Sequence, residues 1–387
     1  MKLWVGGLCG LVALVAGGCL SGPDLGELFS GEAEDEVVAK SGWSRVAAHG
    51  VLRTPVVSVA FSPDGKAIAT GHYPTVATDV RVSVLFSPPG HIQLWQLDPD
   101  DHLRTLSDKG SVTIEGYMFE RLQFTSDSRH VCVHVGDSVD DRGQDYRYEV
   151  LVWDADTFKL ERRNASSRGT LSGGARFVTE REGDPHDEST IVIRDLATGS
   201  VLSRLKANRP QDGLVFSPDA RLLATSVGET SENRTTAIWD CASGNRLCTL
   251  PFDADWSASG FSRDGKSFAA GHSINKSIEV WNSLDGSTIR TLVPGFSKEY
   301  TSIRGLAFSP DDRLLAAALE VGRRGEIRVW EIEGGKLLTT IADPSIWGFT
   351  AVAFSPDGTL LAAGDPEGVL TLCAVPEEHR PGNVGRE

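Results

Sequence analysis

The feature that most constrains this chain is an internal repeat built on an apolar run followed by Phe-Ser-Pro-Asp-Gly. Close copies occupy residues 59–65, 214–220, 306–312 and 352–358, a fifth lies at 260–265, and weaker copies lie at 124–128 and 171–174. Their anchor positions are 61, 124, 171, 216, 261, 308 and 354, at intervals of 63, 47, 45, 45, 47 and 46 residues. A period of this length is typical of repeat folds, in which each unit buries its apolar face against the next.

Each repeat is predicted to form a small antiparallel sheet. The apolar run is the first strand, and Ser-Pro-Asp-Gly is a tight turn, because Pro presets φ and Gly accepts a positive φ. A second apolar strand follows, and a third ends in an aromatic–acidic pair such as Trp153-Asp154, Trp239-Asp240 or Trp330-Glu331. One position of the second strand carries a small side chain, which predicts close approach of a neighbouring sheet: Ala69, Cys132, Ala224, Ala269, Ala316 and Ala362.

Four strands per unit, a period near 45 residues and the Trp-Asp ending resemble WD40 repeats, and the resemblance covers residues 43–375. It implies an all-β fold: a seven-bladed β-propeller with four antiparallel strands per blade around a central channel. The chain departs from the family in one respect. Most units lack the Gly-His pair that usually precedes the first strand, so the resemblance does not extend to the buried His–Asp network associated with that pair.

The ends of the repeat region predict how the ring closes. The seventh unit stops near Val375, before a fourth strand, whereas residues 43–49 upstream form a strand-like segment with no unit of their own. We predict that this segment pairs with the seventh blade, because pairing removes an open sheet edge. The alternative is a loose N-terminal strand. Residues 376–387 are expected to form a polar C-terminal tail.

The N-terminus has the pattern of a targeting segment. Residues 3–23 carry no charge, and the small residues before Cys19 resemble a bacterial lipoprotein box. We therefore expect a signal peptide at 1–18, lipidation of Cys19 and an acidic flexible tether over 19–42. Leu20 after the cysteine favours the outer membrane, facing the periplasm of a cell envelope. Ordinary secretion and an uncleaved anchor are the alternatives, and the tether region has a short amphipathic helix as its alternative.

Long insertions between the second and third strands of units one to three predict a binding face. They span residues 72–90, 136–149 and 181–189, and in the propeller family such loops share a face with the connections between blades. An acidic rim with aromatic anchors suits a basic or amphipathic protein partner; the alternative is plain solvated loops. The candidate contacts are Asp137, Asp140, Asp141, Asp145, Tyr146, Tyr148, Glu182, Asp184 and Asp187, with Trp347 near the channel mouth.

The charge balance restricts the class of partner. A formal net charge of −15 repels nucleic-acid backbones and anionic lipid surfaces. We therefore expect protein partners, no nucleic acid, and membrane contact through the N-terminal lipid only. The propeller itself is expected to be a monomer.

Two sets of residues are candidates for disulfide and metal chemistry. Cys241 and Cys248 flank a predicted turn and would form a disulfide in an exported protein if their Cα atoms come within about 7 Å. His130, Cys132 and His134 alternate along a predicted strand and would share one face. The alternation suits a packed interior strand better than a metal site, so no metal or other cofactor is expected.

No sequence motif indicates catalysis. The chain has no nucleophile elbow, zinc-binding His-Glu-x-x-His, P-loop or dinucleotide fingerprint. The predicted function is a non-catalytic protein-interaction scaffold, a propeller lipoprotein of the cell envelope. One alternative is a propeller hydrolase or lyase with a site at the channel mouth. Another is a TolB-like periplasmic propeller, since the Phe-Ser-Pro-Asp-Gly turn also occurs in that group; the Trp-Asp ending favours WD40.

Overall fold

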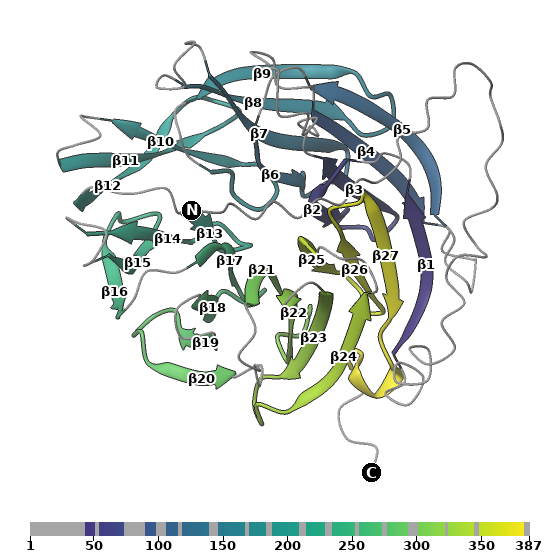
Figure 1. Cartoon of the computed structure of the whole chain (residues 1–387). Coiled ribbons are helices and arrows are strands. Elements are labelled where there is room, and N and C mark those ends of the chain that lie inside the picture. The colour runs from purple at the N-terminus through teal and green to yellow at the C-terminus, as the bar shows by residue number, and fades with distance from the viewer. Residues whose placement is uncertain are drawn as a thin grey trace, which may run out of the picture.

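The computed structural model of the chain is a ring of seven β-sheets around a central axis (Figure 1). It describes residues 43–382 apart from 51–53, 73–89, 98–105, 115–117, 139–145, 167–169, 183–187, 209–213, 229–233, 252–254, 273–276, 293–300, 322–323 and 344–347. Each sheet is one blade, and the chain visits the blades in order. The sequence prediction of a seven-bladed β-propeller built from antiparallel strands is therefore confirmed.

Six blades contain four hydrogen-bonded strands. Blades 1 and 2 consist of β2 (Val56–Phe61), β3 (Ala67–His72), β4 (Gly90–Leu97), β5 (Leu106–Ile114), β6 (Met118–Phe124), β7 (His130–Ser138), β8 (Tyr146–Asp154) and β9 (Leu160–Ser166). Blades 4 and 5 consist of β13 (Leu214–Phe216), β14 (Leu222–Val227), β15 (Thr235–Asp240), β16 (Arg246–Leu250), β17 (Asp255–Phe261), β18 (Ser267–His272), β19 (Ser277–Asn282) and β20 (Thr288–Leu292). Blade 6 consists of β21 (Thr301–Phe308), β22 (Leu314–Val321), β23 (Arg324–Glu331) and β24 (Leu337–Asp343).

Blade 3 has a reduced inner edge. Its sheet holds β10 (Phe177–Glu182), β11 (Glu188–Asp195) and β12 (Val201–Asn208), and a single bridge between Leu171 and Val178 stands in the place of the inner strand. The repeat is weakest here, with Ser172-Gly173-Gly174 in place of Ser-Pro-Asp. Gly173 lies against the next blade, where a Cβ would come 2.6 Å from the carbonyl oxygen of Pro218. The position therefore has room only for glycine.

The ring closes as predicted. Blade 7 contains β25 (Ala351–Phe354), β26 (Leu360–Gly364) and β27 (Val369–Ala374), and its fourth strand is β1 (Ser44–Gly50) from the start of the propeller. β1 runs antiparallel to β27 over the whole strand, as Figure 1 shows at the yellow and purple edge. β1 covers the edge of β27 that would otherwise be unpaired and gives blade 7 its fourth strand.

The C-terminal segment folds back beside this closing strand. A single 3-10 turn, η2 (Glu377–His379), follows β27, and the His379 ring stacks on Trp43 with the ring centroids 6.4 Å apart. Trp43 is completely buried. Among the described residues, no helix is long and apolar enough to cross a membrane.

The core lies between neighbouring blades. The six small residues of the second strands, Ala69, Cys132, Ala224, Ala269, Ala316 and Ala362, are all fully buried, which confirms the predicted close approach of the sheets. The tryptophans at the ends of the third strands are buried as well. In blades 1 and 4 the indole N–H donates to a threonine hydroxyl of the second strand, from Trp95 to Thr70 and from Trp239 to Thr225. Burial of these large apolar side chains between the sheets explains why the aromatic column recurs.

The disulfide predicted between Cys241 and Cys248 is not present, and both cysteines are free thiols. Cys241 packs in the core between blades 3 and 4, whereas the Cys248 thiol donates to the carbonyl of Ser283 in blade 5. The two side chains therefore serve opposite faces of blade 4. Burial raises the pKa of both thiols and keeps them in the protonated form.

Candidate functional site

The turns between the first and second strands have one local structure, repeated seven times. A Ser or Thr opens each turn, and its hydroxyl accepts the backbone N–H five residues later at 2.8–3.0 Å. In six turns the same hydroxyl donates to the Asp two residues later at 2.5–2.9 Å. These local bonds satisfy buried donors and fix the direction of the turn.

The fourth residue of every turn has a positive φ, between 52° and 72°. Glycine is the residue that adopts this conformation without strain, and it occurs in blades 1, 5 and 7. The other four blades place Ser128, Ala175, Ala220 and Asp312 there. Two of these four, Ser128 and Asp312, carry polar side chains that reach the preceding blade.

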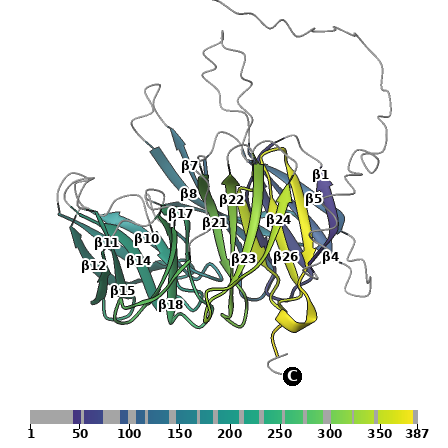
Figure 2. The same ribbon diagram turned by 60° about the horizontal axis from the view of Figure 1, so that its bottom comes forward.

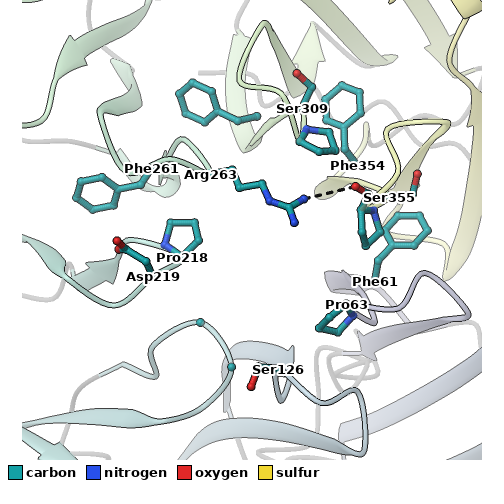
Figure 3. Close-up of a pocket in the computed structure, with 15 residues that line it drawn as sticks. Phe61, Pro63, Ser126, Pro218, Asp219, Phe261, Arg263, Ser309, Phe354 and Ser355 are labelled. Atoms are coloured by element: carbon teal, nitrogen blue, oxygen red, sulfur yellow. Dashed lines mark hydrogen bonds between the residues drawn. The ribbon is translucent and has the colours of Figure 1, made fainter. Parts of the chain in front are cut away.

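The second residues of the seven turns converge on the axis and line one pocket at the mouth of the channel, with a volume of ≈ 610 Å³ (Figure 3). The ring consists of Pro63, Ser126, Gly173, Pro218, Arg263, Pro310 and Pro356. Phenylalanines from the ends of the inner strands form part of its wall: Phe61, Phe261, Phe308 and Phe354. The pocket therefore combines an apolar wall with one cationic side chain.

Arg263 is the residue that breaks the ring's neutral character. Its side chain extends across the pocket toward blade 7, as Figure 3 shows, and Nη1 donates to the carbonyl of Pro356 at 3.4 Å. Blade 5 also differs from the proline-containing blades because Arg263 has a backbone N–H where proline has none. This extra donor needs an acceptor.

Asp312 of blade 6 supplies that acceptor. Its Oδ1 accepts the N–H of Arg263 at 2.6 Å, and its Oδ2 accepts the N–H of Asp264 at 3.0 Å. Desolvation raises the pKa of the Asp312 carboxyl, although the two N–H donors oppose the shift. The carboxylate thus holds the backbone of the arginine turn from the neighbouring blade.

The acidic residues of the turns are engaged within their own turns. The pocket-lining Asp219 accepts from the Ser217 hydroxyl at 2.6 Å and from the N–H of Arg221 at 3.1 Å. The Asp264 carboxylate lies 3.0 Å from the ammonium of Lys266. Asp219 also lies 3.5 Å from Arg221 Nε, so each of these two carboxylates is paired with a cation of its own turn.

The loop face lies at the opposite end of the blades, because the connections between second and third strands leave an antiparallel sheet at the other end from these turns (Figure 2). Asp137 lies one residue before the end of β7, and Tyr146 and Tyr148 lie in the first three residues of β8. The register pairs Asp137 with Arg147, Ser138 with Tyr146 and Gly136 with Tyr148, so the three predicted contacts lie near the end of one hairpin, with Asp137 on the other sheet face from the two tyrosines. Glu182 ends β10 with its carboxylate 3.5 Å from Arg204 Nε. Cys19, Asp140, Asp141, Asp145, Asp184, Asp187 and Trp347 lie outside the described residues.

The predicted packing of Cys132 in an interior strand is confirmed, and His130 of the same strand lies beside two carboxylates of the same blade. Cys132 is buried against blade 3, and burial raises its thiol pKa to about 12. The possible ligand atoms of His130, Asp154 and Glu161, from β7, β8 and β9, lie within 4.8 Å of one another. His130 Nε2 and Glu161 Oε2 are 2.9 Å apart, so these two groups satisfy each other as hydrogen-bond partners. One imidazole nitrogen and two carboxylates are a donor set that could hold a divalent metal.

Sequence reasoning missed the pocket. The signal was present in the repeat itself: the residue two positions after each anchor is proline in four units and arginine in one. The partner of that arginine was not visible, because Asp312 lies 49 residues from Arg263 and occupies a position that favours glycine.

The WD40 family (WD domain, G-beta repeat) matches residues 45–76, 287–331 and 335–370. An uncharacterized WD repeat-containing protein of Synechocystis is 30% identical over 152 residues, covering 39% of this chain and 40% of that protein. Rat apoptotic protease-activating factor 1 is 26% identical over 196 residues, 49% of this chain and 15% of that protein. A WD repeat-containing protein of Schistosoma mansoni is 28% identical over 175 residues, 45% of this chain and 50% of that protein. The chain thus spans half or less of the length of these relatives.

Proposed function

We propose that this chain is a WD40-type propeller that serves as a non-catalytic platform for protein partners. The observation that carries the proposal is the closed ring of seven blades, in which segments of the first, fifth, sixth and seventh blades match the WD40 family. Such a ring buries its sheets against each other and leaves the connecting segments to vary. The chain is also similar in sequence to WD repeat-containing proteins.

The loop face is the proposed partner surface. Asp137, Tyr146 and Tyr148 lie near the end of the β7–β8 hairpin, and Glu182 ends the corresponding strand of blade 3. Acidic side chains with aromatic anchors favour a basic or amphipathic partner, since complementary charge steers encounter and buried aromatics contribute most of the affinity. Asp140, Asp141, Asp145, Asp184, Asp187 and Trp347 belong to the same proposed surface.

We further propose that the propeller is held at the outer membrane, facing the periplasm, by a lipid on Cys19. Residues 19–42 carry an excess of acidic side chains with Gly, Ser and Pro, a composition that favours an extended tether. The tether would join the propeller at Trp43, directly before the closing strand β1. Intact-mass measurement of the purified protein tests the anchor: a mature chain that begins at acylated Cys19 supports it, and an unmodified or differently cleaved N-terminus contradicts it.

The partner surface is tested by pull-down from detergent-solubilised envelope of the source cells. In the full-length chain, Asp140, Asp141 and Asp145 are replaced by Asn. A matched control neutralises three exposed acids at the other end of the blades, with Asp156→Asn, Glu333→Gln and Glu378→Gln. Loss of a partner from the loop variant, with retention by the control, supports the proposal. Identical partners for both variants and the wild type would rule out this surface.

A further inference from the structure

The pocket at the channel mouth is a site distinct from the loop face. It lies at the turn end of the blades, and all seven blades contribute one equivalent residue to it. Six of these residues are proline, serine or glycine, and the seventh is Arg263. A ring that is neutral at six positions and cationic at one defines where a charged ligand group would lie.

The guanidinium of Arg263 has hydrogen-bonding capacity to spare. Arginine carries five N–H donors in a planar fork. Among the described residues, the side chain makes one hydrogen bond, the 3.4 Å contact with Pro356, and no ion pair with any carboxylate. Its backbone, in contrast, is fixed by Asp312 of the neighbouring blade. The structure therefore anchors the base of the side chain and leaves its charged end available.

The nearby carboxylates do not compete for this charge. Asp219 turns its oxygens to Ser217 and Arg221, and Asp264 pairs with Lys266. Asp312 uses both oxygens on backbone N–H groups. Each of these acids is thus engaged elsewhere, so that an external anion would meet an arginine without a carboxylate partner.

The wall and size of the pocket restrict the rest of the ligand. Phe61, Phe308 and Phe354 are partly buried and line the pocket between the turns. A cavity of ≈ 610 Å³ lies within the usual range of small-ligand sites, about 300–1,000 Å³. Apolar walls favour an apolar ligand body, and the planar fork of arginine matches a carboxylate in a bidentate pair.

We infer that the channel-mouth pocket binds a carboxylate next to an apolar group, with the carboxylate paired to Arg263 and the apolar group against the phenylalanines. Two sources share this chemistry: a small free carboxylic acid and the C-terminal residue of a polypeptide. The inference is independent of the loop face, because the two surfaces lie at opposite ends of the blades.

The test is calorimetric titration of the full-length protein with three probes. N-acetyl-phenylalanine carries the carboxylate next to an apolar benzyl group, N-acetyl-phenylalanine amide lacks the charge, and the peptide Gly-Gly-Gly-Phe places the carboxylate at a chain end. We expect saturable binding of the two acids, at least tenfold weaker binding of the amide, and weaker binding at high salt. Tighter binding of the peptide identifies a chain end as the source, and equal or tighter binding of the small acid identifies a free acid.

Matched variants locate the site. Arg263→Gln keeps the backbone donor to Asp312 and removes the charge, so it should lower the affinity for the two acids at least tenfold. Arg263→Lys keeps the charge and should retain part of the binding. Arg129→Gln makes the same charge change at an exposed turn residue of blade 2 that does not line this pocket, and it should bind as the wild type does. Failure of both acids to bind, equal binding of acid and amide, or unchanged binding by a folded Arg263→Gln protein would overturn the inference. The amide comparison uses wild-type protein and remains decisive even if a variant does not fold.

Discussion

At the junction between blades 1 and 2 and at the junction between blades 5 and 6, a residue of the second blade accepts hydrogen bonds from backbone N–H groups of the turn in the first blade. The residues that do this differ between the two junctions. In the first, Pro63 contributes no N–H, and the N–H of Asp64 donates to the hydroxyl of Ser128 at 3.1 Å. In the second, Arg263 and Asp264 both contribute an N–H, and Asp312 accepts one on each carboxylate oxygen. Ser128 and Asp312 occupy the same position of their turns, both with positive φ.

The comparison shows that the number of acceptors follows the number of donors. One hydroxyl serves the single N–H of a Pro-Asp turn, and a carboxylate serves the two N–H groups of an Arg-Asp turn. The hydrogen bonds inside the turns are the same at both junctions, from Ser62 in blade 1 and from Ser262 in blade 5. The repeated residues therefore maintain the fold, and the second and fourth turn residues are free to create a site.

The largest expected effect breaks what the two junctions share. Ser62→Ala and Ser262→Ala each remove a fully buried hydroxyl that accepts a backbone N–H and donates to the turn aspartate. An unsatisfied buried donor costs about 1–3 kcal/mol, and we expect each variant to lose that much free energy of unfolding. Denaturant unfolding measures it. A large loss in one blade with none in the other would contradict the shared role.

A smaller effect should separate the junctions. Asp312→Ala removes two acceptors from the neighbouring turn, whereas Ser128→Ala removes one. At about 0.5–1.5 kcal/mol for each hydrogen bond, we expect Asp312→Ala to lower the free energy of unfolding more than Ser128→Ala does. Equal losses would show that the second contact with Arg263 contributes nothing. The same unfolding experiment decides between the two outcomes.

The smallest expected effect is the pH dependence of the free energy of unfolding, and its sign should differ between Asp312 of blade 6 and Asp127 of blade 2. Desolvation raises the pKa of Asp312, so protonation of this group favours the folded state as the pH falls toward about 4. The hydrogen bond from Thr125 lowers the pKa of Asp127, so the contribution of Asp127 to the free energy of unfolding is full above about pH 4 and is lost as the pH falls through the lowered value.

Unfolding of Asp312→Asn and Asp127→Asn between about pH 3 and 7 tests this difference in sign. Relative to wild type, Asp312→Asn should become less stable toward about pH 4, whereas the difference for Asp127→Asn should shrink below it. If the stability of both variants relative to wild type changed with pH in the same direction, the opposite pKa shifts of Asp312 and Asp127 would be contradicted.

The repeat predicted most of the fold because its signals are local. Turn residues, apolar runs and one small position per unit were enough to predict seven blades, and the missing fourth strand near Val375 was enough to pair residues 43–49 with the last blade. The possible disulfide between Cys241 and Cys248 is not formed, because the two thiols lie on opposite faces of blade 4, which sequence spacing does not show.

The candidate pocket depends on relations that no single repeat contains. Arg263 is visible as a departure from the repeated proline, but its position over the channel follows from the ring, and its support comes from Asp312 in the next blade. The cluster of His130, Asp154 and Glu161 likewise joins three strands of blade 2. Contacts of this kind require the assembled sheets.

The central claim is that Arg263 and Asp312 act as a unit, and a double-mutant cycle tests it most directly. The variants Arg263→Pro, Asp312→Gly and the double variant restore residues that the repeat carries elsewhere, and their free energies of unfolding are compared with the wild type. With Asp312 in place, Arg263→Pro removes one hydrogen bond and should cost about 1 kcal/mol. In the Asp312→Gly background it removes none and should be neutral or stabilising, since proline fits this turn. A coupling free energy of about 1 kcal/mol between Arg263 and Asp312 is therefore predicted. The same effect of Arg263→Pro in both backgrounds would contradict the claim.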